Sequence, residues 1–295
     1  MLERFDCHRL KARGLNHAVW IGGDGPPVLL LHGYPQTHAT WLHVAPVLAQ
    51  RFTVVAPDLR GYGASDAPDD DDGHTVFSKR EMAADQVAIM SQLGFHEYTV
   101  VGHDRGARVT YRMALDYPER VTRLCSLDVV PTYDTWAGFD HESGLGTFHW
   151  TFLAQPSPLP ETMIGHDPVY FLRWLLRRWA APGFEFDAAA MREYERAFSR
   201  PEVIAATCAD YRAGATTDLA HDREDRETGR KIACPLLCLW GEKEGFAEQG
   251  GRTPLDIWRD WCAGPVSGKS VASGHFLPEE APDAVLESLT SFLTV

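Results

Sequence analysis

The chain lacks three features that would mark it as a secreted, metal-binding or membrane protein. It has only six cysteines in 295 residues, and none are spaced like the ligands of a zinc site or the pairs of a disulfide framework. No run of about 18 apolar residues occurs. Residues 1–30 mix acidic and basic side chains and hold no apolar stretch of signal-peptide length. We therefore expect reduced, structural thiols in a cytoplasmic protein without a membrane segment.

Positive charge is also scarce. The sequence has 28 Lys and Arg against 41 Asp and Glu, so its formal net charge is −13, and part of the excess lies in acidic runs such as 69–72. A surface of this sign repels polyanions, so we exclude nucleic acid and anionic membrane surfaces as partners. A small anionic substrate would need a local cationic pocket to overcome this field.

What is present is ordinary globular sequence, with 44% hydrophobic and 23% charged residues. Short apolar runs alternate with helical stretches, which is typical of strands buried on both faces of a parallel sheet. Such alternation predicts right-handed βαβ units, with helices covering the sheet and ligands bound beyond the carboxyl ends of the strands. The expected strands are 28–31, 52–56, 98–101, 124–130, 236–240 and 269–272.

The alternation is interrupted between Pro131 and about Arg226. Aromatic and helical sequence, such as 170–179 and 188–198, takes its place there. An insertion of this kind would form a helical cap over one end of the sheet. The sequence therefore predicts an α/β fold with a mostly parallel, doubly wound sheet, in which residues 1–130 and 227–295 form the core and residues 131–226 form the cap.

A polar residue between two glycines follows the expected strand 98–101. In the segment Gly102-His103-Asp104-Arg105-Gly106, the glycines stand where a side chain would clash in a tight turn from strand to helix. This pattern is the nucleophile elbow, with Asp104 at the position that serine takes in many hydrolases. The pentapeptide alone is also compatible with an aspartate that only caps the following helix.

Two further motifs stand at strand ends, in the order that an elbow of this kind requires. Segment 32–35 follows the first parallel strand, where the backbone N–H of Tyr34, together with that of Arg105, would face the nucleophile as an oxyanion hole. His275 follows the last strand, where a triad histidine belongs. The order Asp104 and then His275 favours a catalytic role over simple helix capping.

From these motifs the chain is identified as a member of the α/β-hydrolase superfamily, and within it the chain resembles the fluoroacetate (haloacetate) dehalogenases over essentially its whole length. The resemblance rests on segments 102–108, 127–132, 148–150 and 210–213. It implies a small anionic haloacid as substrate, a homodimer, and no metal or organic cofactor. It further implies a nucleophile, Asp104; a water-activating pair, Asp128 and His275; two carboxylate-binding arginines, Arg105 and Arg108; and three halide ligands, His149, Trp150 and Tyr211.

The residue types suit this chemistry. A carboxylate can displace halide from a saturated carbon, and water can then hydrolyse the resulting ester and regenerate Asp104, whereas a serine would form an ether that does not turn over. Arg105 and Arg108 are spaced i, i+3 and share one face of the helix that begins beside the nucleophile. Because buried charges need partners, we expect the two guanidinium groups to clamp a carboxylate rather than form surface salt bridges.

Some of these assignments have rivals. Glu244 is the alternative to Asp128 as the acid that holds His275, because many relatives place that acid after the later strand 236–240. Aromatic residues in an insertion are by default hydrophobic packing, and without the resemblance His149, Trp150 and Tyr211 would be assigned to the core as well. The packing interpretation is kept for Trp136, Trp174 and Trp179.

The predicted reaction is hydrolysis of a fluoroacetate- or haloacetate-type 2-haloacid to the 2-hydroxy acid and halide, through an ester on Asp104. Epoxide hydrolases and haloalkane dehalogenases also use an elbow aspartate, but they commonly carry Trp directly after it, where Arg105 stands here. The alternative of another class is a non-catalytic ligand-binding protein on the same fold. The presence of Asp104, Asp128 and His275 together disfavours that alternative.

Overall fold

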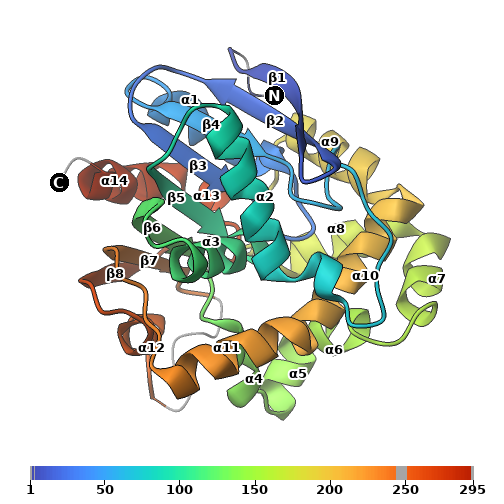
Figure 1. The fold of residues 1–295 in the computed structure, drawn as a ribbon. Coiled ribbons are helices and arrows are strands. Elements are labelled where there is room, and N and C mark those ends of the chain that lie inside the picture. Colours follow the sequence, from blue (N-terminus) through green and yellow to red (C-terminus); the bar gives the residue numbers. More distant parts are fainter. Residues whose placement is uncertain (1, 3, 244–250, 294–295) are drawn as a thin grey trace.

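A central eight-stranded sheet organises the chain (Figure 1). The computed structural model describes residues 2, 4–243 and 251–293. The strand order is β1-β2-β4-β3-β5-β6-β7-β8; β1 and β2 pair antiparallel with their neighbours, and β3 to β8 run parallel. The mostly parallel sheet is therefore confirmed. The strands are β1 (Asp6–Ala12), β2 (Leu15–Gly22), β3 (Pro27–Leu31), β4 (Thr53–Pro57), β5 (Tyr98–His103), β6 (Val121–Leu127), β7 (Leu236–Gly241) and β8 (Val266–Val271).

The strands expected from apolar runs are present as β3 to β8, with ends that shift by up to three residues. The largest correction concerns β6, which ends at Leu127 rather than at residue 130. Asp128 has a positive φ of 58°, which leaves the extended region and ends the strand. Asp128 thus stands just beyond the carboxyl end of β6.

The hairpin of β1 and β2 is not among the strands expected from apolar runs. Most residues of β1 are exposed, and its sequence, DCHRLKA, is largely polar. Strands at the antiparallel edge of a sheet are held by main-chain hydrogen bonds and can carry polar side chains on their open face. The sequence of β1 therefore lacks the continuous apolar character of the central strands.

Two apolar layers cover the two faces of the sheet. Along β3, Val28 and Leu30 join the cluster that contains residues of α1 and α14, whereas Leu29 and Leu31 join the cluster that contains residues of α2, α3 and α12. This division follows from the alternation of side chains along a strand. Since both faces are covered, functional groups are left to the strand ends. The helices of the core are η1 (His38–Trp41), α1 (Ala45–Leu48), η2 (Thr75–Phe77), α2 (Lys79–Gln92), α3 (Arg105–Asp116), α12 (Pro254–Trp261), α13 (Leu277–Glu280) and α14 (Pro282–Leu293).

A series of helices, α4 to α11, fills the chain between β6 and β7, and we call this series the cap. Figure 1 shows these helices, coloured from green to orange, grouped to one side of the sheet. The division of the chain into two domains at residues 131 and 226 stays a prediction. Within the described ranges, no helix combines the length and apolar character needed to cross a membrane. The cap helices are α4 (Thr132–Ala137), α5 (His141–Gly146), α6 (His149–Leu153), α7 (Leu159–His166), α8 (Pro168–Trp179), α9 (Ala188–Phe198), α10 (Pro201–Ala215) and α11 (Thr217–Thr228).

Candidate active site

The turn between β5 and α3 has the geometry of a nucleophile elbow. Asp104 stands at this turn with φ 47° and ψ −118°, a conformation that a non-glycine residue adopts rarely. A Cβ on Gly102 would lie 2.5 Å from backbone atoms of Ala107, and one on Gly106 would lie 2.3 Å from the carbonyl oxygen of Leu31. Strand and helix therefore approach closely only because both positions are glycine, and the turn projects the Asp104 carboxylate beyond the end of β5.

Asp104, His275 and Asp128 come together at the carboxyl ends of the parallel strands. His275 Nδ1 lies 2.6 Å from Asp128 Oδ2, and His275 Nε2 lies 3.7 Å from Asp104 Oδ1. The other oxygen of Asp128 accepts the backbone N–H of Gly241 at 2.7 Å. One carboxylate thus fixes the orientation of the imidazole, whose other nitrogen faces the candidate nucleophile. The alternative acid, Glu244, lies outside the described residues.

The charges in this group depend on one another. Burial would raise the pKa of Asp104, but hydrogen bonding to His275 and the positive charges of His275 and Arg105 lower it to about 2. Burial would lower the pKa of His275, but its hydrogen bonds and charge interactions with Asp104 and Asp128 hold that pKa well above its usual value. The two carboxylates therefore favour the protonated form of the imidazole.

The segment expected to form the oxyanion hole lies against the nucleophile. A Cβ on Gly33 would lie 2.5 Å from Cβ of Asp104, so the backbone of residues 33 and 34 passes directly beside that side chain. Arg105, the other expected donor, is the first residue of α3. Residues 34 and 105 thus flank Asp104, as the motif order predicts.

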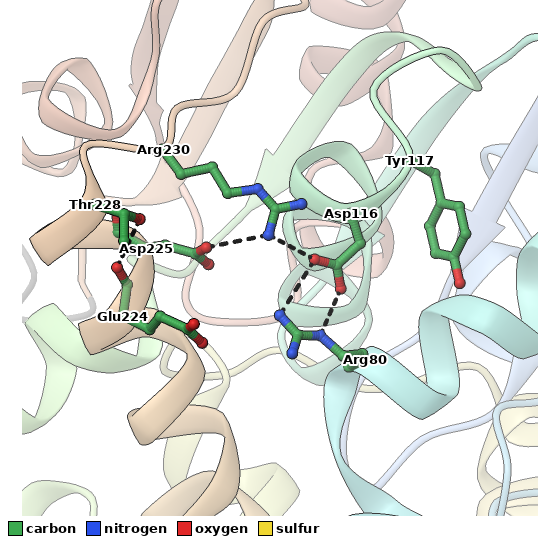
Figure 2. A pocket seen from close by; sticks show the side chains of 7 residues that line it. All are labelled: Arg80, Asp116, Tyr117, Glu224, Asp225, Thr228 and Arg230. Atoms are coloured by element: carbon green, nitrogen blue, oxygen red, sulfur yellow. Dashed lines mark hydrogen bonds and ion pairs between the residues drawn. The ribbon is translucent and has the colours of Figure 1, made fainter.

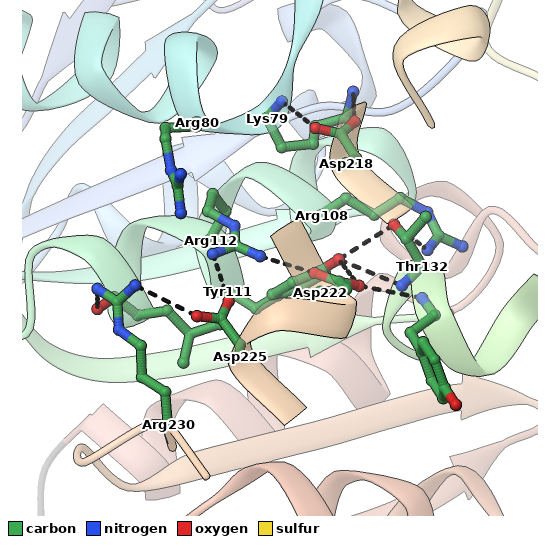
Figure 3. A network of polar contacts seen from close by, with 12 residues as sticks. Lys79, Arg80, Arg108, Tyr111, Arg112, Thr132, Asp218, Asp222, Asp225 and Arg230 are labelled. Atoms are coloured by element: carbon green, nitrogen blue, oxygen red, sulfur yellow. Dashed lines mark hydrogen bonds and ion pairs between the residues drawn. The ribbon is translucent and has the colours of Figure 1, made fainter. Parts of the chain in front are cut away.

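Three arginines form a stripe along α3, at positions 105, 108 and 112, and two of them pair with cap carboxylates. Arg105 Nε and Nη2 donate to Asp210 of α10 at 3.0 and 2.6 Å. Arg112 donates to Asp222 and Asp225 of α11 at 2.7 and 2.5 Å (Figure 3). The spacing of three and then four residues keeps all three guanidinium groups on one face of the helix, and that face meets the cap.

Arg108, between these two, has no carboxylate partner among the residues that the structure describes. It is 3% exposed, and its guanidinium donates only to neutral oxygens: the carbonyl of Val130 at 3.0 Å and the hydroxyls of Thr132 and Thr135 at 3.2 and 3.3 Å. Its Nε has no hydrogen-bond partner within the described ranges. Burial lowers its pKa, yet an arginine remains protonated at any physiological pH. Among the described residues, Arg108 is therefore a buried cation without a carboxylate in salt-bridge contact.

The three cap residues expected to bind halide lie beside these arginines. The guanidinium carbon of Arg108 lies 4.6 Å from the ring centroid of Trp150, and that of Arg105 lies 4.2 Å from the ring of Tyr211. The ring centroids of His149 and Tyr211 are 5.5 Å apart, and those of Trp150 and Tyr211 are 5.8 Å apart. The Tyr211 hydroxyl and His149 Nδ1 are buried without hydrogen-bond partners in the described part of the chain. These polar atoms are free to meet a ligand.

Burial keeps both side chains neutral. It lowers the pKa of His149 to about 3 and raises the pKa of Tyr211 well above its usual value. A neutral imidazole and a neutral phenol can each donate one hydrogen bond without adding positive charge.

Two residues of the site were not identified from the sequence. The Trp179 ring, expected to be packing only, lies 4.4 Å from that of His149 and 5.8 Å from that of His275, and the Trp179 carbonyl accepts the N–H of His275 at 3.0 Å. Asp210, which holds Arg105, is the other. Asp210 directly precedes Tyr211, and this adjacency is the one local signal that could have indicated it.

A groove elsewhere does not compete with this site. Figure 2 shows it between α3 and α11, where Arg80 and Arg230 pair with Asp116, and Arg230 also pairs with Asp225. Both of its arginines are paired with acids at the surface. We assign no ligand to this groove.

One group of side chains in the described residues has the composition of a metal site: His38, Asp58 and Glu193. The Asp58 carboxylate already accepts from His38 and from the backbone of Ala64, and Glu193 is bound by Arg196 at 2.5 and 2.8 Å. These bonds occupy the oxygens that would face an ion. We assign no metal to this group.

Comparison with known proteins agrees with the sheet order and the elbow. The family model described as alpha/beta hydrolase fold matches residues 26–281. The chain belongs to the α/β-hydrolase family. This α/β hydrolase is 41% identical over 295 residues to a fluoroacetate dehalogenase of Burkholderia sp, a match that covers 100% of the chain and 95% of that protein. The expected resemblance to haloacetate dehalogenases is thereby confirmed, and the protein is an enzyme of that hydrolase type.

Other relatives of this α/β hydrolase carry different descriptions. It is 32% identical over 289 residues to a soluble epoxide hydrolase of Corynebacterium sp. (strain C12), covering 97% of the chain and 96% of that protein. A solved structure from Nostoc sp PCC 7120, provisionally assigned to the α/β hydrolases, is 48% identical with a TM-score of 0.96 and covers 100% of the chain and 99% of its own. Similarity alone therefore leaves the substrate to be inferred from the site.

Proposed function

We propose that this enzyme hydrolyses a small 2-haloacid of the fluoroacetate or haloacetate type, releasing halide and the 2-hydroxy acid through an ester on Asp104. The observation that carries the proposal is Arg108. Of the three arginines on this face of α3, Arg108 alone has no carboxylate partner among the described residues. It lies one helical turn from Asp104. A buried charge of this kind needs an anion, and the carboxylate of a haloacid supplies one.

In the first step of the proposed reaction, Asp104 attacks the α-carbon of the substrate. A bond forms between its carboxylate oxygen and that carbon, while the carbon–halogen bond breaks and the halide leaves with the bonding electrons. Arg108, with the free Nη1 of Arg105, holds the substrate carboxylate so that the α-carbon faces Asp104. Tyr211, His149 and Trp150 donate hydrogen bonds to the departing halide.

In the second step, water attacks the carbonyl carbon of the ester. Once Asp104 is esterified its charge is gone, and the pKa of His275 falls because one of the two carboxylates that raise it is neutralised. His275 gives its own proton to solvent and, now neutral, accepts a proton from the attacking water, while Asp128 keeps its orientation and stabilises the imidazolium. The backbone N–H groups of Tyr34 and Arg105 stabilise the oxyanion. Its collapse breaks the bond between the Asp104 carbonyl carbon and the product oxygen, which takes the proton from His275, so that the hydroxy acid leaves and the Asp104 carboxylate is regenerated.

The second candidate function is epoxide hydrolysis. It is favoured by the 32% identity with an epoxide hydrolase and by the buried Tyr211 hydroxyl, which could donate to an epoxide oxygen. An epoxide, however, carries no charge and would leave Arg108 without a counter-ion. The haloacid is therefore the better fit.

The deciding experiment compares four substrates: fluoroacetate, chloroacetate, a neutral haloalkane and an epoxide. Halide release is followed with an ion-selective electrode and diol formation by chromatography. We expect turnover of the haloacids and little of the neutral compounds. Arg108→Met, which keeps an unbranched apolar stem but removes the guanidinium, should lower kcat/KM for the haloacid by roughly 30-fold or more, equivalent to about 2 to 5 kcal/mol. Preference for a neutral substrate would contradict the proposal.

We also infer a homodimer, as the family resemblance implies. Several large apolar side chains of α7 and α8 are exposed, with Tyr170 at 66% and Met163 at 58%. An apolar surface of this kind favours association. Size-exclusion chromatography with light scattering would give the mass in solution, and a single-chain mass would contradict the inference. The cytoplasmic location stays a prediction.

A further inference from the structure

In the described part of the chain, the Arg108 guanidinium donates to neutral oxygens, and the hydroxyls of Thr132 and Tyr111 lie between it and the carboxylate of Asp222. Arg108 Nη1 lies 3.2 Å from Thr132 Oγ1, which lies 3.0 Å from the hydroxyl oxygen of Tyr111. That hydroxyl lies 2.9 Å from Oδ2 of Asp222 (Figure 3). All four side chains are buried. The series of contacts runs from the unpaired cation of the site, through two neutral oxygens, to a carboxylate on the cap helix α11.

We propose that Thr132, Tyr111 and Asp222 form a positioning chain that aims the Arg108 guanidinium at the substrate carboxylate. The inference rests on the proposed function, which makes Arg108 the ligand of that carboxylate. None of the three needs to touch substrate. They act through Arg108 and are positioning residues, not catalytic ones.

The Tyr111 hydroxyl lies between two acceptors. It donates toward Oδ2 of Asp222, at 2.9 Å, and toward Oγ1 of Thr132, at 3.0 Å, and its oxygen accepts the backbone N–H of Thr132 at 3.2 Å. Thr132 Oγ1 thus accepts from both Tyr111 and Arg108 Nη1. These contacts hold the hydroxyl oxygen of Thr132 in place, and through it they fix one side of the guanidinium.

An acid that is separated from Arg108 by two hydroxyl groups has an advantage over one in a direct ion pair. Arg105 and Arg112 bind carboxylates directly, and their charges are neutralised inside the protein. A carboxylate in direct contact with Arg108 would do the same and would compete with the substrate. Two intervening hydroxyls orient Arg108 while its Nε stays without a partner in the described ranges. The positive charge thus remains available to the ligand.

The same contacts join the cap to the core at the rim of the site. Asp222 also accepts the backbone N–H of Tyr133 at 3.0 Å, so it ties the first turn of α4 to α3 and α11. Thr132 and Thr135, both ligands of Arg108, lie on α4. Asp222 therefore sets the position of the helix whose hydroxyls hold Arg108.

Tyr111→Phe tests the chain with the least disturbance. It removes the central oxygen, keeps the ring that packs 5.6 Å from Trp258 and 6.2 Å from Trp261, and leaves the bond between Asp222 and Arg112 intact. Burial raises the pKa of Asp222 to about 6, so the assays are run at pH 8, where it is ionised. Two quantities are measured: the steady-state constants for fluoroacetate and chloroacetate, and the dissociation constant of glycolate by titration calorimetry.

We expect KM and the glycolate dissociation constant to rise about three- to tenfold, as befits the loss of a neutral hydrogen bond beside the ligand. Because the carboxylate is held in both the ground state and the transition state, kcat and the ratio of fluoride to chloride turnover should stay within about twofold. Thr132→Val should give the same pattern, and Thr132→Ser, which keeps the hydroxyl, should restore wild-type constants.

Tyr98→Phe is the matched control. It deletes the same atom from a tyrosine that is 2% exposed and whose hydroxyl has no hydrogen-bond partner in the described part of the chain. If Tyr111→Phe binds glycolate as tightly as Tyr98→Phe and wild type do, the positioning chain is wrong, although the proposed function stands. If the wild type itself releases no halide from any haloacid and does not bind glycolate, the proposed function fails and the inference fails with it.

Discussion

His275 lies between two carboxylates, and only one of them keeps its charge through the proposed reaction. In the proposed reaction Asp104 becomes a neutral ester, whereas Asp128 is not alkylated and keeps its contact with His275. Loss of the Asp104 charge would lower the pKa of His275, so that after alkylation the imidazole would give its proton to solvent and act as the base. The chemistry of the first step prepares the base for the second.

This role predicts a specific failure in His275→Ala. Alkylation of Asp104 needs no base, so the ester should form and accumulate while turnover stops. Intact-protein mass spectrometry after incubation with fluoroacetate should show one added carboxymethyl group, which peptide mapping would assign to Asp104. An unmodified mass in a folded protein would contradict the nucleophile assignment.

The halide donors give a second prediction at the residue scale. Fluoride has the most concentrated developing charge of the halides, so its departure depends most on directed hydrogen bonds. Trp150→Phe and Tyr211→Phe each delete one donor and keep an aromatic ring. Each should lower fluoroacetate turnover by about 1.5 to 3 kcal/mol, roughly one to two orders of magnitude, and should lower chloroacetate turnover much less. Equal losses of turnover on both substrates would mean that the two residues serve only as hydrophobic packing.

At the scale of elements, α3 joins the core to the cap through buried ion pairs. Arg105 binds Asp210 of α10, which also binds Lys79 of α2. The Asp210 carboxylate therefore faces two cations and lies in the interior. Removing one member of such a pair leaves charges buried without a partner, which costs far more than the pair itself contributes.

Asp210→Asn should accordingly lower the free energy of unfolding by about 3 to 5 kcal/mol. Asp260→Asn, which disrupts the exposed pair with Arg252, makes the same chemical change at the surface and should have little effect. Urea denaturation followed by circular dichroism measures both. Similar losses in the two variants would show that the ion pair between α3 and α10 does not hold the cap to the core.

The sequence predicts those site residues that stand beside a recognisable strand, and it does not predict those whose partners lie far away along the chain. Asp104 and Asp128 directly follow apolar strands, and His275 stands shortly after the last strand, so the sequence indicates all three as candidates. The counter-ions of the α3 stripe gave no such signal, since Asp210 and Asp222 lie more than 100 residues from the arginines that they bind. The sequence alone likewise could not distinguish Trp179 from a residue of the hydrophobic core. His275 follows β8, far along the chain, and only the folded structure brings it beside Trp179.

At the scale of the whole molecule, a buried carboxyl links the core to the cap on the far side of the site. Glu279 of α13 accepts from the Tyr194 hydroxyl of α9 at 3.0 Å and from Gln36 in the loop after β3. Burial raises its pKa to about 8, although these hydrogen bonds oppose the shift. Glu279 is thus protonated in the folded protein at neutral pH.

The sign of the resulting pH dependence follows from linkage. A carboxyl whose pKa is higher in the folded state favours folding below its unfolded pKa, and that contribution is lost as the pH rises through its folded value. Stability should therefore fall between about pH 4.5 and 8, and Glu279→Gln should flatten this part of the curve. Urea denaturation at several pH values measures it. The exposed Glu287→Gln is the control, and parallel curves for both variants would contradict the assignment.

The stripe of arginines on α3 also has a consequence for exchanging the cap between related enzymes. Asp210 and Asp222 are two of the cap residues that bind this stripe. Both would face neutral side chains if the cap were transferred to a relative that lacks these arginines at the position of α3. A recombinant that exchanges residues 131–226 alone would separate acids from their bases, whereas one that also carries residues 105–116 would keep them together. The unit that keeps these ion pairs together is thus larger than the insertion and includes α3 of the core.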